Sequence, residues 1–199
     1  MQKAGSFQIL SEETSEGNLG KVTLLLRAAA EGDKNSEAQV FDILYDQLRS
    51  LARRQLNRHG RQTLDTHDLV HEAYVKIAGN QPQDIADRGH FLCLSARAMR
   101  QILVDHARSK IRQKRGSGAH KETLKDDHVR VNMHFERVLA VDQALARLGR
   151  NDSRLASIVE CKFFAGFTEV ETANALGLSE RSVRRLWQHA RSELRVALA

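Results

Sequence analysis

The segment TEVETANALGLSERSVRRLWQHARSELR, which begins at Thr168, allows few structures other than two helices joined by a tight turn. Thr168 and Glu171 have the spacing of a capping box, in which each side chain satisfies a free backbone N–H of the first helical turn. Ala173 is small where two helices must cross closely, and Gly177 follows where a sharp turn favours a positive φ. Ser179 can cap the second helix. The segment therefore predicts a helix-turn-helix.

The second of these helices has an apolar face and a basic face. The apolar residues at helical spacing predict a buried stripe made of Val183, Leu186, Trp187, Ala190 and Leu194. The opposite side chains are of types that donate hydrogen bonds to base edges and phosphates in a major groove. Five Arg and one Glu between Arg181 and Arg195 give a local charge of +4. We therefore expect a DNA recognition helix rather than a solvated basic helix, with candidate contacts at Ser179, Arg181, Ser182, Arg184, Arg185 and Gln188.

The rest of the chain also predicts helices, since no stretch shows convincing strand alternation. Residues 1–20 are polar and predict a mobile leader. A short helix is expected from Lys21 until Gly32 stops it. The next helix carries a stripe that should face a core, made of Phe41, Leu44, Tyr45, Leu48, Leu51 and Ala52.

Two further helices are expected, one from Thr66 as a plausible N-cap to Gly79 and one from about His90 to Arg112. Between them lies a polar loop with the only proline, Pro82. The second helix turns Phe91, Leu94, Ala98 and Ile102 one way and Arg97, Gln101, Asp105, Arg108 and Arg112 the other. After His134, three or four more helices should follow, with breaks at Gly149 and Gly166.

The helical period collapses between Arg112 and His134, in a stretch dense in charges of both signs. Such a composition cannot bury enough surface to order itself, so it predicts a flexible linker over residues 114–133. The expected fold is all-α, with two small helical domains at 21–113 and 134–199. The second domain contains the helix-turn-helix.

The formal net charge of +6 matters because it is clustered. From Arg97 through Lys121 there are eight Lys or Arg and one Asp, a local charge of +7. Such a cluster on one helix is typical of a surface that binds nucleic acid.

Cys93 and Cys161 lie far apart inside apolar helical patterns. Two such residues make neither a disulfide framework nor a four-ligand zinc site, so we expect buried free thiols in a reducing cytosol. No apolar run approaches the roughly 20 residues that span a bilayer, and the N-terminus lacks the pattern of a signal peptide. These features predict a cytoplasmic protein.

Enzymatic motifs are missing from the sequence: there is no P-loop, no dinucleotide fingerprint and no nucleophile–base arrangement. The string HDLVH places His67 and His71 one turn apart, as in the two-histidine helix of zinc peptidases. Asp68 stands where that motif has Glu, however, and no downstream cluster offers an evident third ligand. We therefore expect His71 on a helix surface, no metal, no cofactor and no catalysis.

Three motifs in order resemble RNA polymerase sigma factors of the extracytoplasmic-function (ECF) subfamily. DLVHEAYVKI resembles the polymerase-contacting helix, and HFLCLSARAMRQILVDHARSKIRQKR resembles the next family helix, which engages the minus-10 promoter element. A linker and a helix-turn-helix, which engages the minus-35 element, follow in the family's order. The resemblance covers roughly Lys21 to the C-terminus, and it implies a protein that binds core RNA polymerase and promoter DNA.

The resemblance also implies roles for individual residues. Asp68 and Glu72, one turn apart, would lie with Val75 and Lys76 on the face that docks against the coiled coil of the largest polymerase subunit. The loop from Gly79 to Gly89 corresponds to the promoter-melting segment. The matching minus-10 contacts are Arg97, Arg100, Gln101, Arg108 and Lys110.

One position departs from the family pattern. Many members carry a Trp in the stretch that matches FLCL, where this chain has Leu94, and aromatic stacking is a common way to hold an exposed base. Phe91 could substitute, but we expect it to belong to the core. The residue that captures a flipped base stays open.

The main alternative is a conventional helix-turn-helix regulator that binds an operator as a dimer without polymerase. The sigma-factor interpretation predicts instead a chain that is monomeric when free. Its polymerase-binding surfaces would be natural targets for an anti-sigma factor.

Overall fold

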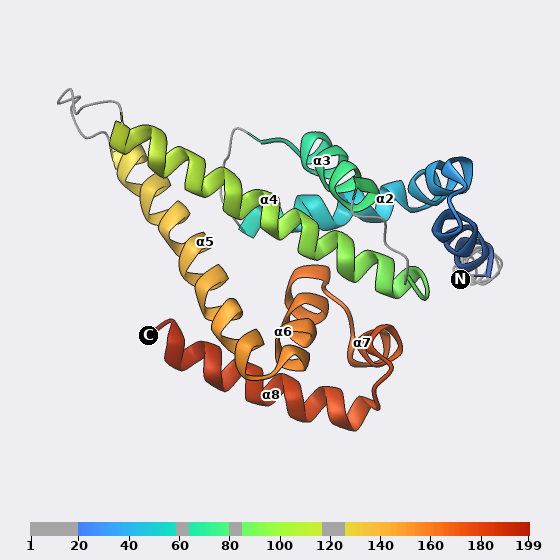
Figure 1. The fold of residues 1–199 in the computed structure, drawn as a ribbon. Coiled ribbons are helices and arrows are strands. Elements are labelled where there is room, and N and C mark those ends of the chain that lie inside the picture. The colour runs from blue at the N-terminus through green and yellow to red at the C-terminus, as the bar shows by residue number, and fades with distance from the viewer. Residues whose placement is uncertain (1–19, 59–63, 80–84, 117–125) are drawn as a thin grey trace, which may run out of the picture.

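The computed structural model describes residues 20–58, 64–79, 85–116 and 126–199, and every regular element in these ranges is a helix (Figure 1). A first helix covers residues 20–30 and is followed by Gly32, whose φ is 98°. The N-terminal half then continues with α2 (Lys34–Arg58), α3 (Thr66–Gly79) and α4 (Arg88–Gly116).

The C-terminal half begins with the long helix α5 and ends with the helix-turn-helix. Its elements are α5 (Asp126–Asn151), α6 (Ser153–Val159), the π-helix η1 (Glu160–Ala165), α7 (Glu169–Leu176) and α8 (Glu180–Ala197). None of the helices in the described ranges is long and apolar enough to cross a membrane. The predicted all-α fold is confirmed.

Helix α4 is the centre of the molecule. It packs against α2 and α3 of its own half and against α5, η1 and α7 of the C-terminal half (Figure 1). Between Phe91 and Val104 the single exposed residue of α4 is Arg97. A helix that is covered on nearly all sides must carry apolar or small residues around most of its circumference. The stretch from Phe91 to Val104 has this composition.

The two halves share one hydrophobic core, which runs from Val22 to Ala190. Most of the stripe expected on α2 is part of it, because Leu44, Leu48, Leu51 and Ala52 are buried and Phe41 and Tyr45 pack against them. A smaller cluster joins Val104 and Ala107 of α4 to Phe135 and Val138 of α5.

The ends of the predicted linker are helical. Helix α4 continues to Gly116 and α5 begins at Asp126, which leaves only part of residues 114–133 between the helices. Residues 117–125 lie outside the described residues, as do 1–19 of the expected leader. The smaller cluster packs α5 against α4 from Phe135 onward, which lies beyond the predicted linker.

Two predicted helix boundaries also differ in detail. Asp65 rather than Thr66 caps α3, since its Oδ1 accepts a hydrogen bond of 2.8 Å from the backbone N–H of Asp68. Gly149 does not break a helix but lies inside α5, where an added Cβ would stand 3.3 Å from that of Ala156 in α6. The break comes at Asp152, which caps α6.

The expectation of free thiols is wrong, because Cys93 of α4 and Cys161 of η1 form a disulfide. The two residues are 68 positions apart in sequence. Their proximity depends on how the halves pack, and no local pattern contains that information. The disulfide links the halves covalently inside the shared core.

Candidate nucleic-acid interface

The helix-turn-helix has the capping geometry that the sequence predicts. Thr168 Oγ1 accepts a hydrogen bond from the Glu171 N–H at 3.2 Å, and Glu171 Oε2 accepts one from the Thr168 N–H at 2.8 Å. Gly177 ends α7 with φ 62°, and Ser179 caps α8 by accepting from the Ser182 N–H at 3.2 Å. These contacts fix the start of α8 relative to α7.

Helix α8 turns its apolar face inward and its basic face outward. Val183, Leu186 and Ala190 are buried, and Trp187 and Leu194 pack against the core at its edge. Four side chains predicted to contact DNA are exposed on the other face: Arg181, Arg184, Arg185 and Gln188. This face is therefore available to a polyanion.

Arg184 already has a carboxylate partner within the helix-turn-helix. Its Nε and Nη2 donate to Oε2 of Glu169 at 3.0 and 2.9 Å, which raises the pKa of Arg184 above its ordinary value. Because 61% of the Arg184 side chain remains exposed, the pair is a weak one, and a phosphate or base can compete for the guanidinium.

The residues predicted on α4 are less accessible than those on α8. The side chains of Arg97 and Arg108 are 54% and 51% exposed, whereas that of Arg100 is only 10% exposed. Gln101 and Lys110 are half-buried. Arg100 also lies over the ring of Phe164, with its guanidinium carbon 5.7 Å from the ring centroid.

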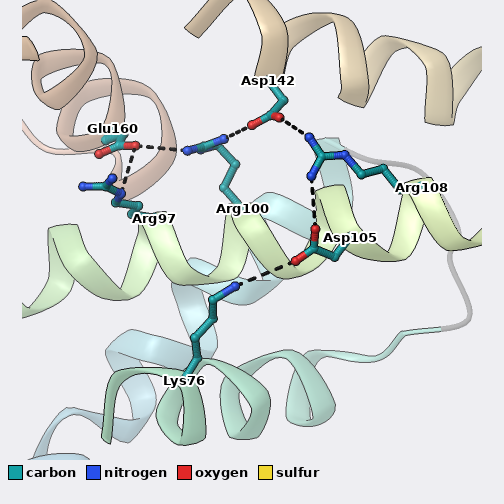
Figure 2. Close-up of polar contacts among 7 residues, drawn as sticks. All are labelled: Lys76, Arg97, Arg100, Asp105, Arg108, Asp142 and Glu160. Atoms are coloured by element: carbon teal, nitrogen blue, oxygen red, sulfur yellow. Dashed lines mark hydrogen bonds and ion pairs between the residues drawn. The ribbon is translucent and has the colours of Figure 1, made fainter. Parts of the chain in front are cut away.

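An unbroken series of ion pairs connects α3, α4, α5 and η1 across the interface between the halves (Figure 2). We call it the central ion-pair network. In order, its members are Lys76, Asp105, Arg108, Asp142, Arg100, Glu160 and Arg97.

The most buried part of the network surrounds Arg100. One of its nitrogens, Nη1, donates to Oδ1 of Asp142, while Nη2 donates to Oε1 of Glu160 at 3.2 Å. Nη2 of Arg108 donates to the other oxygen of Asp142, Oδ2, at 3.0 Å. Nε of Arg97 lies 3.7 Å from Oε1 of Glu160. Three of the five residues predicted to contact the minus-10 element are thus paired with carboxylates of the C-terminal half.

Asp142 and Glu160 were not identified from the sequence, although a signal was present. Each is a single acid in an apolar stretch, LAVDQAL and SIVECKFF. A carboxylate on a buried helix face requires a cation, because an unpaired buried charge is expensive. Such acids predict a buried Arg or Lys nearby without saying which one.

The face predicted to bind polymerase is exposed on α3. Asp68, Glu72 and Val75 point to solvent, and 57% of Val75 is accessible. The opposite face packs into the core through Leu69, Val70 and Ala73. Lys76 is half-buried, and its Nζ lies 3.8 Å from Oδ2 of Asp105 in α4.

The histidines of HDLVH do not form part of a metal cluster. His67 and His71 are exposed and their rings stack at a centroid distance of 6.4 Å. Within the described ranges, no group of three or more His, Cys, Asp or Glu residues could hold a metal ion. His71 lies on the helix surface, as expected.

The expected promoter-melting loop is described only in part, since residues 80–84 lie outside the described residues. Its end is ordered by Asp87, whose Oδ1 accepts from the backbone N–H of His90 at 2.8 Å and so caps α4. Phe91 is 6% exposed within the core, which confirms the expectation for this residue. Leu94 is half-buried.

Comparisons with known proteins give the chain its family. No curated protein matches it. Among solved structures it is similar to CnrH, described in complex with the cytosolic domain of CnrY, at 19% identity and a TM-score of 0.40, over 89% of this chain and 97% of that chain. The family model described as ECF sigma factor matches residues 19–199. The chain therefore belongs to the ECF sigma factors, the regulatory proteins that direct RNA polymerase in transcription initiation.

Proposed function

We propose that this sigma factor recognises the minus-35 element of its promoters through α8 and the minus-10 element through α4, while α3 docks on core polymerase. The observation that carries the proposal is the exposed row of Arg181, Arg184, Arg185 and Gln188 on a firmly capped helix. Arginine binds guanine with two hydrogen bonds and glutamine binds adenine in the same way, so this row can read a major groove.

The minus-10 assignment draws on the local charge of α4 and on Arg97 and Arg108, which keep about half of their side-chain surface exposed. The polymerase assignment draws on α3, where two exposed acids, Asp68 and Glu72, precede an exposed apolar residue, Val75. A basic partner with an apolar patch would complement that surface.

Reconstituted transcription with core polymerase and a promoter library tests the minus-35 assignment. The triple variant Arg181→Ala, Arg184→Ala, Arg185→Ala should lose promoter-specific initiation, because each bidentate contact to guanine contributes about 1 to 3 kcal/mol. The matched control replaces three exposed arginines of α5 with alanine: Arg137, Arg147 and Arg150. It removes the same amount of positive charge from the same half.

Equal initiation by the two triple variants would overturn the assignment of α8. A wild-type chain that binds an operator duplex as a dimer but never joins core polymerase would support a conventional regulator instead.

Polymerase docking has its own test, in which Asp68 and Glu72 are both changed to Lys. The double variant should lose at least tenfold in affinity for core polymerase, since two favourable charge contacts become repulsive. Asp46→Lys, at an exposed position of α2, is the control and should bind as the wild type does. Binding of the double variant at wild-type strength would exclude α3 as the docking helix.

A further inference from the structure

The disulfide joins the same two segments that the central ion-pair network joins. Cys93 and Cys161 are the only cysteines of the chain. Their Cα atoms are 5.3 Å apart, a separation that a disulfide spans without backbone movement. Because both residues are buried in the shared core, the packing of α4 against η1 places them together.

The arginines of α4 lie directly beside this bond. Arg97 follows Cys93 by about one helical turn and Arg100 by about two, so both lie near the same face of α4. Glu160, which both arginines contact at 3.7 and 3.2 Å, is the residue before Cys161. Moving η1 away from α4 therefore requires that the ion pairs and the disulfide both break.

DNA cannot reach Arg100 while the halves stay together. The Arg100 side chain is 10% exposed, and its two terminal nitrogens, Nη1 and Nη2, bind Asp142 and Glu160. A phosphate must come within hydrogen-bond distance of a guanidinium, and here two carboxylates hold those positions. Separation of the halves would expose Arg100 and free Arg97 and Arg108.

We infer that Cys93 and Cys161 form a dithiol–disulfide site that controls the access of promoter DNA to α4. In the disulfide form, the C-terminal half stays fastened to α4. Thiol reductants open the site and hydroperoxides close it. The inference rests on the proposed function, because it takes α4 as a DNA-binding helix.

Opening is a two-electron reduction by thiol–disulfide exchange. A reductant thiolate attacks Sγ of Cys93, the more exposed cysteine at 7% against 1% for Cys161. A mixed disulfide forms at Cys93, and Cys161 leaves as a thiolate that takes up a proton. A second thiol of the reductant then displaces Cys93, which is protonated in turn, and the reductant departs as a disulfide.

Closing is the reverse oxidation, with a hydroperoxide as the electron acceptor. One cysteine thiolate attacks the O–O bond and becomes a sulfenic acid, while the other oxygen leaves and is protonated to water or an alcohol. The second thiol attacks that sulfur, the S–S bond forms and water leaves. Two electrons pass from the cysteines to the peroxide.

The test uses the full chain after treatment with hydrogen peroxide or dithiothreitol. Free thiols are counted by alkylation and mass spectrometry, and binding to fluorescent single-stranded DNA of random sequence is followed by anisotropy. We expect no free thiol and weak binding after peroxide, and two free thiols and at least about tenfold tighter binding after reduction. A chain that is open one-tenth of the time binds about tenfold more weakly than one that is always open.

Two kinds of variant separate the bond from its surroundings. Cys161→Ala removes the disulfide without burying a hydroxyl group, and it should bind DNA equally well under both treatments. Glu160→Gln weakens the ion pairs and should tighten DNA binding by the reduced chain. Its matched control is Glu136→Gln, at an exposed position of α5, which has the same change of charge and should have little effect.

The inference is overturned if peroxide leaves two alkylatable thiols, or if the oxidised and reduced chains bind DNA equally well. The radius of gyration from X-ray scattering, which should rise on reduction, tests the opening without any DNA. If it rises while neither form binds DNA or supports transcription with core polymerase, the proposed function fails. If transcription is promoter-specific but equal in both redox forms, the function holds and the redox control fails.

Discussion

Replacing Arg100 with Met in the oxidised chain should lower the free energy of unfolding by about 3 kcal/mol. The side chains of Arg100, Asp142 and Glu160 are 10%, 19% and 12% exposed, so the variant leaves two largely buried carboxylates without their shared cation. Removing one partner of a buried ion pair costs about 3 to 5 kcal/mol. The lower end applies here because each carboxylate retains a half-exposed arginine, Arg108 or Arg97.

Urea unfolding followed by circular dichroism measures this loss, with the disulfide intact in both the folded and the unfolded state. Arg184→Met is the matched control. Its ion pair with Glu169 is 61% and 31% exposed, so its loss should cost much less stability than the loss of Arg100. Adding Asp142→Asn and Glu160→Gln to the Arg100 variant should restore part of the stability, because the uncompensated charges are then gone.

An Arg100→Met chain that is no less stable than the Arg184→Met chain would refute this role of Arg100. Arg100 would then contribute little to the interface between the halves, and its burial would have to be incidental.

Three further predictions concern local structure. Thr168→Ala removes the capping box and should reduce the free energy of unfolding by about 1 kcal/mol in urea, whereas Thr168→Ser should retain it. Gly177→Ala should lower the free energy of unfolding by about 1 kcal/mol because of the φ of 62° alone, since no atom lies within 4 Å of the added Cβ. Gly79→Ala is the control and should cost clearly less, because its added Cβ also meets no atom within 4 Å and its φ is not positive. Burial, and to a lesser extent the charge of Lys110, lower the pKa of His106 below its ordinary 6.5. As the pH falls, His106 is therefore protonated in the unfolded chain before it is protonated in the folded one. The free energy of unfolding should decline as the pH falls below about 6.5. In urea unfolding at several pH values, the free energy of unfolding of His106→Gln should fall less steeply with falling pH than that of the wild type. Parallel curves for the two chains would contradict the assignment to His106.

The helices and the helix-turn-helix could be predicted because their causes are local. The pairing of Thr168 with Glu171, the turn at Gly177 and the spacing from Val183 to Ala190 each lie within a few residues of one another. The exposed arginines of α8 follow directly, since a helix with one buried face must present the other to solvent.

The surroundings of α4 could not be predicted in the same way. Whether Arg100 faces solvent or Asp142 depends on contacts between residues that are 42 positions apart. The disulfide depends on a similar long-range contact, between residues that are 68 positions apart. An acid in an apolar stretch indicates that a cation will lie nearby, but the local sequence does not say which residue supplies it.

The π-helix makes the length of one short segment critical. Ile158, Val159, Glu160 and Cys161 are four consecutive buried residues, which is possible because this part of the chain packs against helices on both sides. Deleting one residue from 160–165 would return the segment to ordinary helical pitch and rotate everything beyond it by about 100°. The basic face of α8 would then point in another direction, so the fold should tolerate substitutions in this segment better than a change in its length.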